Sequence, residues 1–214
     1  MPYLIQRALA LVGLVVLGPL ILVLAVAVRL TSPGPAFHRA TRVRPGGTFT
    51  LFKVRTMRIG AAHAGPGITA AGDARVTRLG RLLRRTKLDE LPQLWNVVRG
   101  DMALVGPRPE DPRYVDWTDP LHAHVFGALP GITGPTALAY RDEEARLASS
   151  ASDRARSQGR AEASPEDLDA IYRDEVLPAK LALDAAYLRS RSFLGDLRIL
   201  LATVRPRSSG PSTR

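Results

Sequence analysis

The longest apolar run in the chain covers residues 8–28, ALALVGLVVLGPLILVLAVAV, and contains no charged residue. At about 1.5 Å per residue, a helix of this length spans a hydrocarbon core of roughly 30 Å. Gly18 and Pro19 lie near its midpoint, and a proline inside a helix removes a hydrogen bond and bends the axis. The pattern therefore predicts a bent membrane helix.

Three interpretations of this run compete. A cleaved signal peptide would use Arg7 and the Ala-Val-Ala triplet at 25–27, although the run is long for a signal core. A straight transmembrane helix conflicts with the central proline, and Arg7 and Arg29 place positive charge at both ends, so charge does not choose an orientation. A helix that enters and leaves by the same face accommodates both observations. We therefore expect a re-entrant membrane helix over residues 1–31, bent at Pro19.

After this helix the pattern changes to short alternating segments. Residues 36–43 and 48–57 have the composition of strands, and the Pro45–Gly47 turn separates them, which predicts a β-hairpin. Lys53 and Arg55 lie two residues apart on the second strand and are expected to point to the same side.

Helical periodicity returns at residues 75–87, where an apolar stripe is surrounded by arginines. Such a helix lies on a membrane surface or packs on the domain with a solvated basic face. A second helix is expected from Asp89 to Arg99, with Pro92 in its first turn. Further along, residues 141–166 indicate a helical or mobile insertion, and another helix is expected to start at Ser164.

Charge and composition narrow the possible partners. The chain has 30 Lys and Arg against 20 Asp and Glu, a net charge of +10, which indicates an anionic partner such as nucleic acid, acidic lipid or a phosphorylated substrate. Aromatic residues make up only 6% of the chain and no nucleic-acid reading motif is present, which argues against nucleic acid. The absence of cysteine excludes disulfides, thiolate catalysis and cysteine-ligated metals.

The adjacent carboxylates Asp89 and Glu90 follow the basic run directly. Acidic residues at a helix start can simply complement the helix dipole and cap free amides. A helix start surrounded by arginines also binds phosphate, and a carboxylate there can attack phosphorus while its neighbour helps to hold Mg²⁺. Arg108 stands between Pro107 and Pro109, which fix its backbone and suit it to phosphate binding, although an ordinary surface turn gives the same pattern.

The order of these motifs is more specific than any one of them. The apolar helix is followed by SPGP, FKVRTM, TRLGRLLRRTKLDELPQLWNVVRGDMALVGPRP, PGITG and DLRILLATV. This order closely resembles the bacterial sugar transferase family, the monotopic polyprenyl-phosphate phosphoglycosyl transferases, from about residue 4 to residue 204. The resemblance implies the compact form of the family, without the additional N-terminal membrane helices of larger relatives.

The resemblance also implies roles for individual residues. Asp89 resembles the nucleophile that attacks the β-phosphate of a UDP-sugar and releases UMP, and Glu90, together with Asp89, resembles the Mg²⁺ site. The residues that match phosphate- or substrate-binding positions are Lys53, Arg55, Arg85 and Arg108. The chain departs from the family after PGITG, where Pro135–Ala137 replaces a Trp-Gln-Val segment, so the sugar is not indicated.

The sequence thus predicts an α/β protein with an N-terminal re-entrant membrane helix and a small, mainly helical catalytic domain that carries a β-hairpin and interfacial amphipathic helices. The expected divisions are residues 1–31 for the membrane helix, 32–204 for a cytoplasmic domain and 205–214 for a disordered basic tail. The expected function is transfer of a sugar-1-phosphate from a UDP-sugar to polyprenyl (undecaprenyl) phosphate at the bacterial inner membrane, with Mg²⁺ as cofactor. The alternative is a non-enzymatic, membrane-tethered basic module that binds acidic lipid or nucleic acid.

Overall fold

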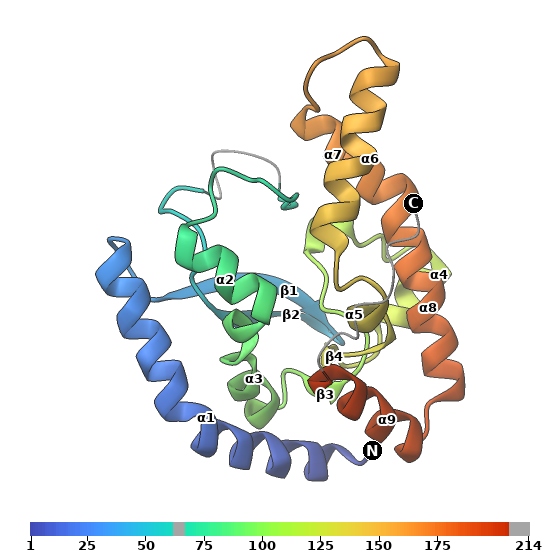
Figure 1. The fold of residues 1–214 in the computed structure, drawn as a ribbon. Coiled ribbons are helices and arrows are strands. Elements are labelled where there is room, and N and C mark those ends of the chain that lie inside the picture. The colour runs from blue at the N-terminus through green and yellow to red at the C-terminus, as the bar shows by residue number, and fades with distance from the viewer. Residues whose placement is uncertain (62–66, 206–214) are drawn as a thin grey trace.

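The structure, a computed structural model, describes residues 1–61 and 67–205, and most of these residues are helical (Figure 1). The helices are α1 (Tyr3–Thr31), α2 (Arg78–Thr86), α3 (Gln93–Arg99), α4 (Pro120–Phe126), α5 (Pro135–Ala139), α6 (Glu143–Ser157), α7 (Pro165–Ile171), α8 (Leu177–Ser190) and α9 (Phe193–Val204). The strands are β1 (Phe37–Arg44), β2 (Gly47–Val54), β3 (Ala103–Val105) and β4 (Gly131–Thr133). β1 and β2 form the antiparallel hairpin expected from sequence, and β3 and β4 form a parallel pair that was not anticipated. The mainly helical domain with a β-hairpin is confirmed.

Helix α1 is continuous through Pro19, and its two halves run in different directions in Figure 1. The bend agrees with the amide that proline lacks and with the clash of its ring against the preceding turn. Within the described part of the chain, α1 is the one helix long and apolar enough to cross a membrane, with a mean hydropathy of 3.0 over its most apolar window.

The first half of α1 is attached to the domain by polar as well as apolar contacts. Gln6 is fully buried, and its Oε1 accepts hydrogen bonds from the amides of Leu104 (2.8 Å) and Val105 (3.2 Å) at β3. Arg7 Nε donates to the carbonyl of Val98 at 3.0 Å. A buried amide group satisfied in this way is a normal part of a protein interior, so this half of the helix packs as part of the domain fold.

The β-hairpin is fixed from both sides of β2. The ladder pairs Thr41 with Thr50, in register along the whole hairpin. On the other edge, the carboxamide of Asn96 from α3 accepts from the Phe52 amide (3.1 Å) and donates to the Thr50 carbonyl (2.7 Å). Asn96 is fully buried, so it connects α3 to the hairpin in the interior of the domain.

The basic helix is shorter than its pattern predicted. It begins at Arg78 because Thr77 caps it, with Thr77 Oγ1 accepting from the Gly80 amide at 2.9 Å. It ends at Thr86, because the next residue, Lys87, has a φ of +58° in the left-handed region. Apart from glycines, Lys87 is alone in having a positive φ among the described residues.

The prediction that an α-helix runs from Asp89 to Arg99 is wrong in its first turn. Residues Leu88–Glu90 form a 3₁₀ turn, and α3 begins only at Gln93. The reason is that Pro92 has no amide to donate to the Leu88 carbonyl, so an α-helical hydrogen bond cannot form there. The two carboxylates therefore lie in a tight turn between α2 and α3.

The segment after residue 141 is a helical hairpin that projects from the rest of the molecule in Figure 1. Ser164 starts α7 with a capping box to Asp167, as its position in the sequence predicted. The chain then passes through a π-helical turn, Tyr172–Val176, directly into α8. The expected basic tail falls on residues 205–214, of which all but Arg205 lie outside the described residues.

Candidate functional site: a buried carboxylate pair in a cationic cleft

The 3₁₀ turn places both carboxylates inside the protein. Asp89 is 6% exposed and Glu90 is 9% exposed, far below what is usual for acidic side chains. The turn is held by the end of α2 on one side and by Pro92 and α3 on the other. The buried pair faces a cleft of about 2570 Å³ that both residues line.

Glu90 is paired with two cations. Its Oε1 accepts hydrogen bonds from Lys53 Nζ on β2 (3.2 Å) and from Arg108 Nη2 (3.1 Å). Burial alone would raise the pKa of Glu90, but the charges of Lys53 and Arg108 outweigh it and hold this pKa well below its usual range. Glu90 is therefore ionised, and its negative charge in turn raises the pKa of Arg108.

Asp89 has a different environment from its neighbour. Its Oδ1 is buried and has no hydrogen-bond partner in the described part of the chain. Burial raises the pKa of the Asp89 carboxyl, and the positive charge of Lys53 offsets part of that rise. Adjacent residues thus provide one carboxylate that is paired with two cations and one that has an oxygen without a partner among the described residues.

Arg108 reaches the pair from the loop that follows β3. The carbonyl of Pro107 accepts from the Gly131 amide at 2.7 Å, which holds this loop against the start of β4. A side chain at Gly131 would collide with the Gly106 amide, since a Cβ there would lie 2.2 Å from that nitrogen. The PGITG segment thus supports the Arg108 loop, and its Gly131 amide is used within the protein rather than offered to an anion.

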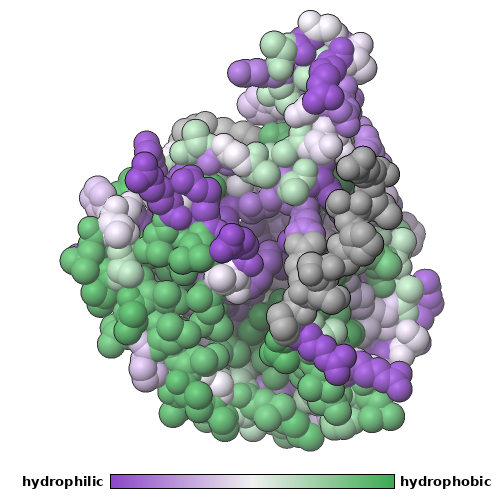
Figure 2. Space-filling view, in the orientation of Figure 1, coloured by the Kyte–Doolittle hydropathy of each residue, from purple (hydrophilic) through white to green (hydrophobic). Residues whose placement is uncertain are grey.

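The cleft extends well beyond the carboxylate pair. Figure 2 shows a hydrophilic hollow between the apolar surface around α1 and the projecting helices. One end is lined by α1 residues such as Ala25 and Arg29, and the other by Glu143 of α6 and Lys180 of α8. A single cleft is thus lined by an apolar helix and by polar residues of α6 and α8, and Asp89 also lines it.

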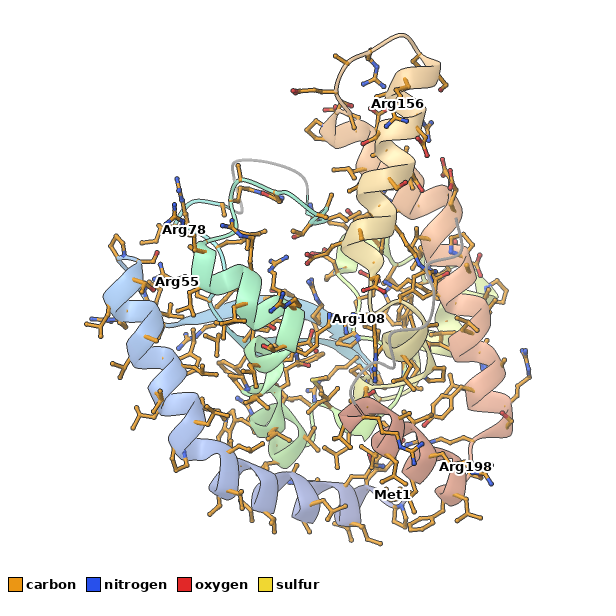
Figure 3. The ribbon with its side chains drawn as sticks, in the orientation of Figure 1. Met1, Arg55, Arg78, Arg108, Arg156 and Arg198 are labelled. Atoms are coloured by element: carbon orange, nitrogen blue, oxygen red, sulfur yellow. The ribbon has the colours of Figure 1, made fainter. Side chains whose placement is uncertain are left out.

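The structure distinguishes among the basic residues expected from sequence. Lys53 and Arg108 contact Glu90, and Figure 3 shows Arg108 near the centre of the molecule. Arg55 lines the cleft but binds the main chain at the end of α1, where its guanidinium donates to the carbonyls of Ser32 (2.7 Å) and Pro33 (2.5 Å). Figure 3 shows Arg55 away from Arg108. Lys53 therefore contacts the carboxylate pair, whereas Arg55 does not join it there.

Arg84 is a candidate that the sequence reasoning missed in favour of its exposed neighbour Arg85. Both line the cleft, but Arg84 is anchored: Nε donates to Thr56 Oγ1 (2.9 Å) and Nη1 to Glu144 Oε1 (2.6 Å). Its charge also offsets part of the rise that burial causes in the pKa of Asp89. The sequence did contain one indication of this role. Gly80 lies one turn before Arg84, and a glycine within a helix often marks the face that packs closely against a neighbour. Arg84 lies on the same face of the helix as Gly80.

An apolar helix attached to a cationic cleft around a carboxylate pair has the features expected of a membrane-associated protein that binds an anionic substrate. The model of the bacterial sugar transferase family matches residues 2–208, and the chain belongs to this family. The resemblance seen in the sequence is therefore confirmed, and the match does not favour the non-enzymatic alternative.

Three relatives illustrate the range of the family. A UDP-glucose:undecaprenyl-phosphate glucose-1-phosphate transferase of Caulobacter vibrioides is 38% identical over 193 residues, covering 87% of this chain and 62% of that protein. A UDP-N-acetylgalactosamine-undecaprenyl-phosphate N-acetylgalactosaminephosphotransferase of Aeromonas hydrophila is 40% identical over 129 residues, 58% of this chain and 30% of that protein. An exopolysaccharide production protein of Rhizobium leguminosarum is 32% identical over 201 residues, 90% of this chain and 87% of that protein. The chain thus spans less than two thirds of the first two proteins.

Proposed function

We propose that the protein transfers a sugar-1-phosphate from a UDP-sugar to undecaprenyl phosphate and releases UMP. The observation that carries this proposal is the contrast within the carboxylate pair: Glu90 is bound by Lys53 and Arg108, whereas Asp89 keeps a buried oxygen without a partner. A carboxylate that is desolvated and not hydrogen-bonded is suited to nucleophilic attack. The names of the relatives support the substrate classes.

The proposed reaction has two steps at Asp89. In the first, a carboxylate oxygen of Asp89 attacks the β-phosphorus of the UDP-sugar, and the bond from that phosphorus to the bridging oxygen breaks. UMP leaves with the electron pair, and a phosphosugar remains on Asp89. In the second, an oxygen of undecaprenyl phosphate attacks the same phosphorus and frees the Asp89 carboxylate, which gives ping-pong kinetics.

The cations around the pair would stabilise the charge that builds on the phosphate oxygens. Arg84 and Arg108 enter the cleft from opposite elements, α2 and the loop after β3, and both are anchored by hydrogen bonds. Fixed donors of this kind stabilise a transition state without having to reorganise. The charge of Lys53 favours the ionised forms of Glu90 and Asp89 and so opposes the rise in pKa that burial causes.

The two carboxylates also fit the Mg²⁺ that the family resemblance implies. The described residues contain no group of three or more acidic or histidine side chains that could hold a metal ion. Mg²⁺ characteristically uses one or two carboxylates together with substrate phosphates, and the free Asp89 Oδ1 beside Glu90 matches that requirement. When bound there, the ion would neutralise charge on the diphosphate.

The proposed reaction also bears on where the protein lies in the cell. We infer that α1 is a re-entrant helix in the bacterial inner membrane and that the domain after Ser32 faces the cytoplasm, where UDP-sugars are found. The bend at Pro19 and the cleft that reaches α1 support this arrangement, because a lipid phosphate then meets Asp89 near the membrane surface.

Incubation of the full chain with Mg²⁺ and a UDP-sugar, without lipid, tests the covalent step. We expect up to one equivalent of UMP and a phosphosugar mass on the Asp89 peptide, with UDP-glucose and UDP-N-acetylgalactosamine as the first substrates. The Asp89→Asn variant is the control and should give neither. UMP release that requires undecaprenyl phosphate in the first turnover would contradict the two-step mechanism.

A further inference from the structure

The loop that presents Arg108 has an unusual shortage of backbone donors. Arg108 lies between Pro107 and Pro109, and proline has no amide hydrogen. The Arg108 amide is therefore the one backbone donor of the Pro-Arg-Pro triplet. Any hydrogen bond that holds this triplet through a donor of its backbone has to use that amide.

The acceptor for this amide is a buried carboxylate on α8. Arg108 N donates to Asp184 Oδ2 at 3.3 Å, and Asp184 is 3% exposed. Asp184 does not line the cleft, whereas Arg108 does. On the other side, the Pro107 carbonyl is held by the Gly131 amide, so the loop is fixed through one acceptor and one donor.

Asp184 also lies close to Thr136 at the start of α5. The polar groups of Thr136 and the Arg108 amide partly offset the rise that burial causes in the pKa of Asp184. Thr136 is fully buried and follows the PGITG segment by two residues. The Asp184 carboxylate thus lies beside both the Arg108 loop and the start of α5.

The other oxygen of Asp184 has no compensating contact. Oδ1 is buried and has no hydrogen-bond partner in the described part of the chain. Burying a carboxylate that is incompletely hydrogen-bonded costs free energy. By contrast, Lys180, one turn earlier on α8, is fully engaged in a scaffold with Tyr172 and Glu143.

We propose that Asp184 is a positioning residue that acts through Arg108: by accepting the single amide of the Pro-Arg-Pro triplet, it sets the guanidinium at its distance from Glu90 and from the substrate diphosphate. This inference rests on the proposed function for the identity of the diphosphate. The contact itself does not depend on the substrate, and it is measured separately.

The first test is hydrogen exchange in the full-length chain without substrate. A peptide that contains Pro107, Arg108 and Pro109 has one exchangeable amide in that triplet, so its exchange reports on the Asp184 contact. We expect Asp184→Ala to accelerate exchange at Arg108 by on the order of tenfold or more. Asp184→Asn retains an oxygen acceptor of the same size and should stay close to wild type. Unchanged exchange in Asp184→Ala would overturn the proposal, even if UMP release were never observed.

The second test is a double-mutant cycle on UMP release. In the wild-type background, Asp184→Ala should lower the rate of UMP release by on the order of tenfold. When Arg108 is already alanine, the same change should lower the rate by no more than about twofold further. The matched control is Leu181→Ala, a buried residue on the same helix, whose effect should be the same in both backgrounds. If the losses from Asp184→Ala and Arg108→Ala multiply, Asp184 is an independent structural residue and the proposal fails. A wild-type chain that releases no UMP refutes the proposed function but leaves the exchange result standing.

Discussion

At the scale of single residues, the site depends on two neighbouring carboxylates with opposite surroundings. Asp89 and Glu90 are both buried, yet Glu90 accepts from two cations, whereas Asp89 Oδ1 has no partner in the described part of the chain. Environments that drive the pKa values of neighbouring groups apart commonly mark a division of roles in catalysis.

Asp89→Asn should lower the UMP release rate by on the order of 10³-fold or more, because the amide is not a nucleophile. The same change should leave the melting temperature equal or raise it, since it removes a buried charge whose pKa is raised in the folded state. A gain of ~1 kcal/mol corresponds to about 2–4 °C. The cost of the ionised carboxyl is present above its folded pKa and disappears as the pH falls through its unfolded value. The difference in melting temperature should therefore shrink toward acidic pH.

Lys53→Met should move the acidic limb of the pH–rate profile to higher pH. Burial is the largest cause of the raised pKa of Asp89, and Lys53 is the strongest of the charges that oppose it, so its removal raises that pKa further. Activity requires the ionised carboxylate and is lost as the pH falls through this pKa. The comparison variant is Arg108→Met, which should shift the limb less, because Lys53 acts on both carboxyl groups whereas Arg108 acts mainly on Glu90. Equal shifts for the two variants would show that the limb does not report Asp89.

At the scale of elements, helix α2 carries Arg84 to the cleft through a close contact with the segment after β2. A Cβ at Gly80 would lie 2.0 Å from the Thr56 carbonyl oxygen, and Thr56 Oγ1 accepts from Arg84. Helix α2 can therefore pack this closely against Thr56 only with glycine at position 80. This close packing determines where Arg84 lies in the cleft.

Gly80→Ala should destabilise the protein by roughly 1–3 kcal/mol, because the backbone clash exceeds the ~1 kcal/mol that alanine gains in helix propensity. It should also reduce UMP release, since α2 must move away from Thr56. Chemical denaturation and the UMP assay measure the two effects. Leu82→Ala on the exposed side of the same helix should change stability little. A Gly80→Ala protein as stable as wild type would show that the contact is looser than the structure has it.

The helices and strands also differ in how well the local sequence pattern predicts them. The long features were predictable: the apolar run of α1, the hairpin, and the cap at Ser164 each follow from periodicity or turn chemistry. Strands β3 and β4 have three residues each, too few for any alternation, and their pairing joins segments far apart in the sequence. Apolar periodicity alone did not choose Arg84 over Arg85, because that choice depends on which helix face meets Thr56, and Gly80 was the one marker of that face in the sequence.

At the scale of the whole molecule, apolar and polar surfaces are divided between regions. Figure 2 shows the apolar surface around α1 and α9 at one end and the hydrophilic hollow and projecting helices at the other. Exposed apolar residues on α9 include Phe193, Leu194 and Leu201. An exposed apolar surface of this extent is typical of a membrane-contacting face, which agrees with the proposed location.

Pro19→Ala should straighten α1 and change the side on which the N-terminus lies. Because the chain has no cysteine, a single cysteine at Pro2 or at Ser209 can be labelled without background. In the re-entrant arrangement both positions are shielded from an impermeant reagent in intact cells. In Pro19→Ala the first position should become reactive in part of the population, while the second should stay shielded. Labelling of the first position in the otherwise unchanged chain would show that the helix spans the membrane.

The contact of Asn96 with β2 has a consequence for the protein outside its catalytic role. A two-stranded hairpin leaves an outer edge of unpaired amides and carbonyls, which other chains can extend by adding a strand. Asn96 occupies that edge at Thr50 and Phe52 with its own carboxamide, in the manner of a neighbouring strand. Two backbone groups of this edge are thereby satisfied within the chain, which makes that part of β2 a poorer template for intermolecular β-sheet growth, the route by which exposed strands lead to aggregation.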